Sequence, residues 1–169
     1  SVIKKLARSS VVLILLVSFQ TFSQSKSITE NLLTTPEKTN YQKTSTYAEV
    51  VDFIGVLQNR SDLIHLTSMG KSKEGKSIPV VVLANPKITN PEEARNSGKP
   101  VIYVQGNIHA GEVEGKEVVQ QLMRDILLGD KKHLLDNQIL LFAPIYNTDS
   151  NDKMEKGRRP SQEDSPIEV

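Results

Sequence analysis

The sequence predicts an α/β fold in which helices flank a mixed β-sheet. Two apolar runs of strand length, "PVIYVQGN" (100–107) and "NQILLFAPIYN" (137–147), are typical of strands inside a sheet. Between them, from Val113 onward, apolar residues recur every three and four positions, which predicts an amphipathic helix. Strand, helix and strand in this order form a βαβ unit, whose two strands pair in parallel through a right-handed crossover.

The N-terminal residues 1–24 have the three-part pattern of a secretory signal peptide. A basic stretch with Lys4, Lys5 and Arg8 precedes an apolar core from Val11 to Val17, and small and polar residues follow it. This core is far shorter than the roughly 20 residues that span a bilayer. We therefore expect an exported protein, periplasmic or extracellular, that has no stable membrane anchor.

The next segments predict an arm followed by a helix. Residues 25–43 are rich in Ser, Thr, Asn, Gln and Lys and include Pro36, so we expect a linker and extended arm. Thr46 and Glu49 have the spacing of a capping box, which predicts that a helix begins there. The apolar residues of this helix fall on one face and are Tyr47, Val50, Val51, Ile54 and Leu57.

The middle of the chain predicts a hairpin, a loop and the βαβ unit. Residues 62–86 form two strand-like runs around a polar turn that contains glycine. Residues 86–100 contain three prolines, two asparagines and a glycine, and they predict a loop. The strand at 100–107 is almost continuously apolar, so we expect it to be buried on both faces. The following helix should end at Gly129 and pack through Val118, Val119, Leu122, Met123, Ile126 and Leu127.

Composition excludes several classes of function. The net charge is +1 and aromatic residues make up 5% of the chain, so no basic surface with stacking residues is available for nucleic acid. Cysteine is absent, which excludes disulfides and a thiol nucleophile and leaves His, Asp and Glu as the residues for a metal site. The sequence also has no Gly-x-Ser-x-Gly motif for a serine hydrolase.

His109 and Glu112 lie in the short turn between the strand at 100–107 and the helix. In open α/β sheets, ligands collect where the carboxyl ends of strands meet helix N-termini. Imidazole and carboxylate are ligands that zinc prefers, and Gly106 and Gly111 allow the backbone to bend there. The alternative is a His109 bonded to backbone and a Glu112 that favours the helix start. Spacing alone leaves both interpretations open.

The residues around this pair resemble the zinc carboxypeptidase family. "GNIHAGEVEGKE" (106–117) is similar to the family's metal-binding signature, and the resemblance runs from about Tyr41 to the end of the chain. Three flanking segments also resemble the family: "SMGKSKEGKSIPVVVLANP", "APIYNTDSNDK" and "GRRPSQEDSP". The resemblance implies that residues 44–169 are the N-terminal part of a zinc carboxypeptidase-like domain that is truncated at its C-terminus. The chain looks like a piece of a longer protein.

The resemblance assigns roles to three residues. His109 and Glu112 would be the first two ligands of Zn²⁺, and Arg159 would polarise the scissile carbonyl and stabilise its oxyanion. Arg158 takes this role if the alignment shifts by one position. The family's third ligand, a histidine, is expected beyond Val169, as are its substrate-binding arginine and its general-base glutamate.

Some residues depart from the family or could replace the missing ligand. Thr148 and Ser150 stand where the family usually has Pro and Gly, and both lie in a turn. His133 follows the long helix, which places it roughly 24 Å from the turn, and His65 falls in a strand-like stretch. We therefore reject His133 as the third ligand, and we interpret His65 as a strand histidine that faces solvent or is satisfied by other contacts.

The predicted function is that of a zinc metallocarboxypeptidase, which hydrolyses the C-terminal bonds of peptides or proteins by a metal-activated water. The isolated chain would be inactive because its ligand set is incomplete. One alternative is a zinc amidohydrolase that acts on N-acyl amino acids, since such enzymes share the fold and a His-x-x-Glu pair. The other is an inactive peptide-binding fragment, in which the strand ending at Tyr146 would leave an open sheet edge.

Overall fold

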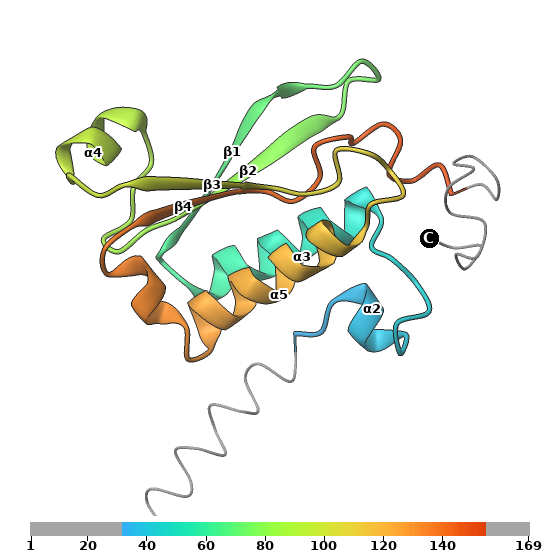
Figure 1. Cartoon of the computed structure of the whole chain (residues 1–169), viewed down its shortest axis with the longest axis horizontal. Helices are drawn as coiled ribbons and strands as arrows, with labels where there is room; N and C mark the ends of the chain where they lie inside the picture. Colours follow the sequence, from blue (N-terminus) through green and yellow to red (C-terminus); the bar gives the residue numbers. More distant parts are fainter. Residues whose placement is uncertain (1–31, 155–169) are drawn as a thin grey trace, which may run out of the picture.

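A four-stranded mixed sheet with two long helices on one face forms the centre of the computed structural model, which describes residues 32–154 (Figure 1). The strand order is β1-β2-β4-β3, with β1 antiparallel to β2, β2 antiparallel to β4, and β3 parallel to β4. The strands are β1 (Ile64–Lys71), β2 (Ser77–Leu83), β3 (Val101–Gln105) and β4 (Ile139–Ala143). The predicted hairpin, the parallel pair and the α/β class are confirmed.

The helices α3 (Tyr47–Arg60) and α5 (Glu114–Leu128) run side by side under the sheet (Figure 1). The predicted capping box of α3 is present, because Glu49 Oε2 accepts the backbone N–H of Thr46 at 2.8 Å and Thr46 Oγ1 accepts that of Glu49 at 3.3 Å. Within the described residues, none of the helices combines the length and the apolar composition that crossing a bilayer requires.

The core between this helix pair and the sheet differs in detail from the predicted helix faces. Phe53, which the predicted face omitted, is buried, whereas Val118 is 57% exposed although it was predicted to pack. Polar side chains occupy part of the inward face of α5. The buried apolar residues of this core include Val50, Ile54, Leu57, Ile64, Val81, Leu83, Val119, Met123, Ile126, Phe142 and Ile145.

Strand β3 is not buried on both faces as predicted. It is one of the two edge strands of the described sheet, and Val101, Ile102 and Tyr103 are 41–48% exposed. The apolar run was correctly identified as a strand, but composition does not report the position of a strand within a sheet. The predicted open edge after Tyr146 is wrong for the same reason, since β4 lies between β2 and β3.

Two short helices occupy segments where the sequence predicted none. Helix α4 (Pro91–Asn96) lies in the predicted loop, and Asn90 caps it by accepting the backbone N–H of Glu93 at 2.9 Å. A helix of six residues is too short to show a clear periodic pattern. A 3₁₀ turn, η1 (Lys132–Leu135), follows α5.

The predicted linker and arm, residues 25–43, contains helix α2 (Thr35–Lys38) within its described part. This segment packs on α5 through Arg124, whose Nη1 donates to the carbonyl of Leu32 at 3.0 Å and to Glu37 Oε2 at 2.7 Å. No local sequence pattern indicates this contact, because its partners lie about ninety positions apart.

The ion pair between Glu37 and Arg124 should make stability depend on pH. Burial opposes ionisation of Glu37, but hydrogen bonds from Arg124 and Thr34 and the charge of Arg124 outweigh it and hold its pKa below 4.5. Glu37→Gln should therefore lower the free energy of unfolding at pH 7 by about 1–2 kcal/mol. A carboxylate with a depressed pKa stabilises the fold fully above its unfolded pKa and loses this effect as pH falls through the folded value.

Urea unfolding at several pH values would measure this dependence. Wild type and Glu37→Gln should converge in stability as the pH falls below 4.5. The exposed Glu92 in the first turn of α4 offers a control, and Glu92→Gln should cost less at pH 7 than Glu37→Gln, in the range of a few tenths of a kcal/mol. A constant difference between wild type and Glu37→Gln from pH 7 to pH 3 would contradict the assignment.

Candidate metal site

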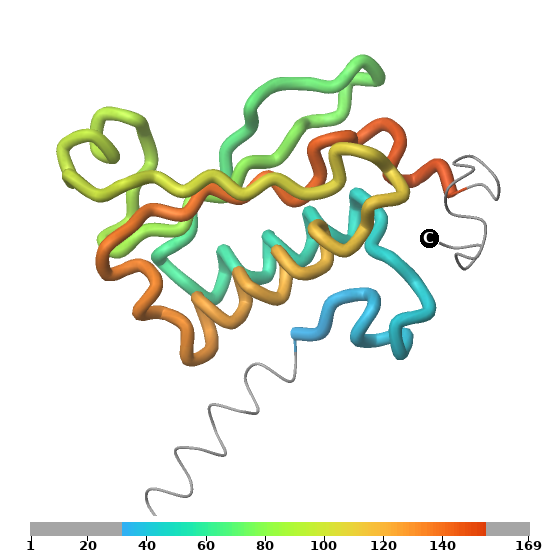
Figure 2. The backbone as a smooth tube through the Cα atoms, in the orientation of Figure 1, coloured from blue at the N-terminus to red at the C-terminus, as the bar shows by residue number. Residues whose placement is uncertain are grey.

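The candidate site lies in the turn between β3 and α5, beside the segment that follows β4 (Figure 2). Hydrogen bonds hold the two segments together beyond the strands. The backbone N–H of Tyr146 donates to the carbonyl of Gly106 at 3.1 Å, and that of Asn147 donates to the carbonyl of Asn107 at 3.0 Å. The turn is therefore fixed at the carboxyl ends of two parallel strands, where α/β proteins bind their ligands.

His109 and Glu112 face one another in this turn. Nδ1 of His109 lies 3.0 Å from both carboxylate oxygens of Glu112, and the backbone N–H of Glu112 donates to the carbonyl of His109 at 3.0 Å. Their side chains are 60% and 45% exposed. An imidazole nitrogen and two carboxylate oxygens thus converge at the surface, which is a donor set that zinc accepts at about 2.0–2.2 Å.

Asn107 forms the bend of the turn. Its φ is 54°, in the left-handed region that Asn adopts more readily than most residues, and it is only 3% exposed. Its side-chain amide donates to the carbonyls of His109 at 3.2 Å, Ala110 at 3.0 Å and Glu112 at 3.4 Å. The sequence assigned the bend to glycine. The residue type and its place before the motif are the sequence signals that point to this role.

A buried polar network lies on the first turn of α5, directly after the candidate ligands. Glu117 accepts hydrogen bonds from Thr44 Oγ1 at 2.6 Å, from Ser45 N at 2.7 Å, from Ser45 Oγ at 2.7 Å and from Gln120 Nε2 at 2.9 Å. Lys116, which is 0% exposed, lies 3.6 Å from Glu117 Oε1. Burial lowers the pKa of Lys116, although the charge and hydrogen bond of Glu117 oppose this.

Lys116 connects this network to the segment after β4. Its ammonium group donates to the carbonyl of Ser45 at 2.5 Å and to Asn151 Oδ1 at 2.6 Å. Asn151 also donates to the carbonyl of Ser45 at 3.2 Å. The network therefore joins residues 44–45, helix α5 and the turn at 147–151. Sequence analysis missed it, because Lys and Glu early in a helix are ordinarily exposed.

The turn at 147–151 forms despite its departures from the family pattern. Its ends are joined by the backbone N–H of Asn151, which donates to the carbonyl of Asn147 at 3.2 Å, and the N–H of Ser150 donates to Asn147 Oδ1 at 3.2 Å. Thr148 is 1% exposed. Ser and Thr at these positions are therefore compatible with a closed turn.

The other residues considered from the sequence lie elsewhere. Arg159 and Arg158 fall outside the described residues. His133 is in η1, at the opposite end of α5 from the turn, and His65 is in β1 (Figure 1). Between residues 32 and 154, no group of three or more His, Asp and Glu side chains is arranged so that it could hold a metal ion. Within this part of the chain, His109 and Glu112 therefore provide two candidate ligands and no third.

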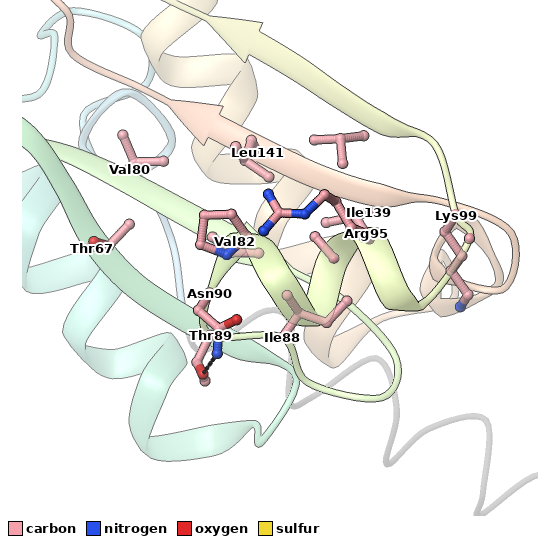
Figure 3. A pocket seen from close by; sticks show the side chains of 14 residues that line it. Thr67, Val80, Val82, Ile88, Thr89, Asn90, Arg95, Lys99, Ile139 and Leu141 are labelled. Atoms are coloured by element: carbon pink, nitrogen blue, oxygen red, sulfur yellow. Dashed lines mark hydrogen bonds between the residues drawn. The ribbon is translucent and has the colours of Figure 1, made fainter.

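A pocket of about 670 Å³ opens on the face of the sheet away from α3 and α5 (Figure 3). Its walls are mainly apolar, with Val82, Ile88 and Leu141 among them, and Arg95 of α4 lies over it. Neither His109 nor Glu112 lines it, and its lining includes no His, Asp or Glu. It therefore offers no His, Asp or Glu side chain for metal binding.

Comparison with known proteins assigns the family. The family model for zinc carboxypeptidases matches residues 50–164, which is more than half of the chain. The chain belongs to the zinc carboxypeptidase family. Mouse carboxypeptidase M is 30% identical over 106 residues, which cover 60% of this chain and 23% of that protein.

Solved structures support the zinc carboxypeptidase fold. Bovine thrombin-activatable fibrinolysis inhibitor, solved with a tick carboxypeptidase inhibitor, superposes with a TM-score of 0.56 and 19% identity, over 68% of this chain and 35% of that one. Carboxypeptidase A from Helicoverpa armigera gives 0.56 and 20%, over 65% and 26%. At these identities the likeness concerns the fold alone. The chain spans between about a quarter and a third of the length of these relatives.

Proposed function

We propose that the full-length protein is an exported, zinc-dependent metallocarboxypeptidase that hydrolyses the C-terminal bonds of peptides or proteins. Family membership supports a peptidase. The proposal rests on one observation: at the carboxyl end of β3, His109 Nδ1 lies 3.0 Å from each carboxylate oxygen of Glu112. The alternative interpretation, in which His109 bonds to backbone, does not account for an Nδ1 that faces the carboxylate.

Different residues of this chain would have different roles in the proposed hydrolysis. A neutral imidazole at His109 and an ionised carboxylate at Glu112 would hold the metal, which supplies Lewis acidity and activates a water molecule when bound. The guanidinium of Arg159 would donate to the scissile carbonyl oxygen and stabilise the negative charge that develops there. Asn107 and the segment after β4 would hold the turn in place.

The proposal applies to the full-length protein because the chain spans only part of its relatives. Reading the coding DNA beyond the codon for Val169 is the first check. A reading frame that continues through an Asn-Arg pair, a histidine and a late glutamate would supply the remaining groups. A stop codon directly after Val169 would exclude tight zinc binding and peptidase activity for this product.

His109→Ala should weaken zinc binding by the full-length protein more than a hundredfold. Loss of a direct ligand should exceed the roughly 10–100-fold effect of removing a residue that only orients one. Competition with a chromophoric chelator would measure the affinity. His133→Ala provides a matched control at the opposite end of α5 and should bind zinc as wild type does. Equal zinc affinity of His109→Ala and wild type would exclude His109 as a ligand.

A substrate panel would separate the peptidase from a zinc amidohydrolase. We expect the zinc-loaded full-length protein to release C-terminal residues from peptides. Cleavage restricted to N-acyl amino acids would favour the amidohydrolase instead. Mass spectrometry of the N-terminus of the secreted protein would test export, since cleavage after the predicted signal peptide removes residues 1–24.

A further inference from the structure

The turn that bears His109 and Glu112 closes around the side chain of Asn107. This side chain is buried, and its Nδ2 lies within hydrogen-bond distance of three carbonyl oxygens, those of residues 109, 110 and 112. An amide NH₂ can donate to them, whereas an oxygen at that position would be repelled by all three. The surroundings therefore require the donor of Asn107 to point into the turn.

Two features connect Asn107 with both candidate ligands. Its bonds go to the carbonyls of His109 and Glu112 themselves, so it acts on the backbone of the two residues rather than on their side chains. Its left-handed backbone, with a φ of 54°, reverses the chain between the end of β3 and the turn. Asn107 therefore helps to set the direction in which the side chains of His109 and Glu112 leave the backbone.

The turn is also fixed from outside by Asn147. The backbone N–H of Asn147 donates to the carbonyl of Asn107 at 3.0 Å, and its side-chain amide donates to the carbonyl of Ile108 at 3.3 Å. Asn147 follows β4, so the turn is held against the neighbouring parallel strand. Asn107 therefore takes part in both sets of hydrogen bonds: its carbonyl accepts from Asn147, and its side chain donates to carbonyls within the turn.

We propose that Asn107 is a positioning residue of the metal site: it holds the backbone of His109 and Glu112 in the ligating arrangement before the metal binds. This inference rests on the proposed function, since it assumes that the pair holds zinc. In the turn, His109 Nδ1 faces both carboxylate oxygens of Glu112 at 3.0 Å. Groups that hydrogen-bond to the side chains of metal ligands typically affect metal affinity by about 10–100-fold, and we expect an effect in the same range from a residue that holds the backbone of the ligands.

Asn107→Gly tests the role, because glycine adopts the left-handed backbone without strain while it removes all three side-chain hydrogen bonds. In the full-length protein, we expect zinc affinity to fall by about 10–100-fold. Asn40→Gly is the matched control, since Asn40 is also left-handed, with a φ of 52°, but lies near α2. Its zinc affinity should equal that of wild type.

Hydrogen exchange on the zinc-free protein gives a second readout that does not involve metal. In Asn107→Gly, the amides of residues 109–113 should exchange faster, while those in the middle of α5, such as Met123, should keep their wild-type protection. Faster exchange throughout α5 would indicate general loss of the fold and overturn the positioning role.

The outcomes separate this inference from the proposed function. If wild type binds no zinc, the proposed function is wrong and the inference fails with it. If wild type binds zinc and Asn107→Gly binds it equally well, the inference alone is overturned. Weaker zinc binding together with locally faster exchange would support both.

Discussion

Glu117→Gln is expected to lower the free energy of unfolding of the full-length protein by about 3 kcal/mol, because it leaves the buried ammonium group of Lys116 without its negative partner. Lys116 is 0% exposed and lies 3.6 Å from Glu117 Oε1. The substitution also replaces one acceptor oxygen by a donor in a site where Gln120 Nε2 and the backbone N–H of Ser45 both donate. Equilibrium unfolding in urea would measure the change.

Glu114→Gln makes the same chemical change on the same helix, at an exposed position. It should cost less than about 1 kcal/mol, the range of a carboxylate near a helix N-terminus. Equal losses for the two variants would show that the buried network contributes no more than a surface charge.

A double-mutant cycle should show that the loss of Lys116 and the loss of the Glu117 charge lower the free energy of unfolding by different amounts. Lys116→Met should cost about 1–2 kcal/mol, less than Glu117→Gln, because Glu117 keeps four other donors when the ammonium group is removed. The double variant should cost less than the sum of the two single variants by at least about 1 kcal/mol, since the two charges interact directly. Additive losses would contradict a coupled pair.

Gly106→Ala is expected to destabilise the protein by about 3 kcal/mol, since no space exists for a methyl group at the end of β3. An added Cβ would lie 2.9 Å from three backbone atoms, which are the carbonyl carbon of Gly115, the nitrogen of Lys116 and the carbonyl oxygen of Pro144. Backbone atoms cannot rotate away as a flexible side chain can. The first turn of α5 would therefore have to move away from β3.

This movement should also affect the candidate metal site, because the turn at 107–113 connects β3 and α5. Gly106→Ala should bind zinc more weakly than wild type in the chelator competition. Gly55→Ala is the control, since its added Cβ meets nothing within 4 Å and Ala favours the helix by about 1 kcal/mol. An unchanged unfolding midpoint for Gly106→Ala would show that the close approach of β3 and α5 is not required.

The predictions for Glu117→Gln and Gly106→Ala depend on contacts between residues that are far apart in the sequence, which sequence patterns do not indicate. Glu117 bonds to residues 72–73 positions away, and Lys116 bonds to Ser45, 71 positions away. The helical pattern of α5 indicated an apolar inward face, but Lys116, Glu117, Gln120 and Arg124 occupy part of it. A periodic pattern identifies the buried face of a helix only where that face is apolar.

Local sequence features predicted much of the fold for a clear physical reason. The capping box at Thr46, the hairpin, and the two strands around α5 all depend on residues within a few positions of one another. The short helix at Pro91–Asn96 was predicted as a loop, because proline and asparagine are common in loops as well as at the start of helices.

By itself, the sequence determined the α/β class, the order of the main helices and strands, and the resemblance that identified His109 and Glu112 as a pair. These features follow from hydrophobic periodicity and from spacing along the chain. Only the tertiary structure decided that β3 lies at an edge, that Asn107 shapes the turn, and that Lys116 and Glu117 are buried. Each of these depends on which distant segments meet, because strand order and burial are set by contacts across the fold.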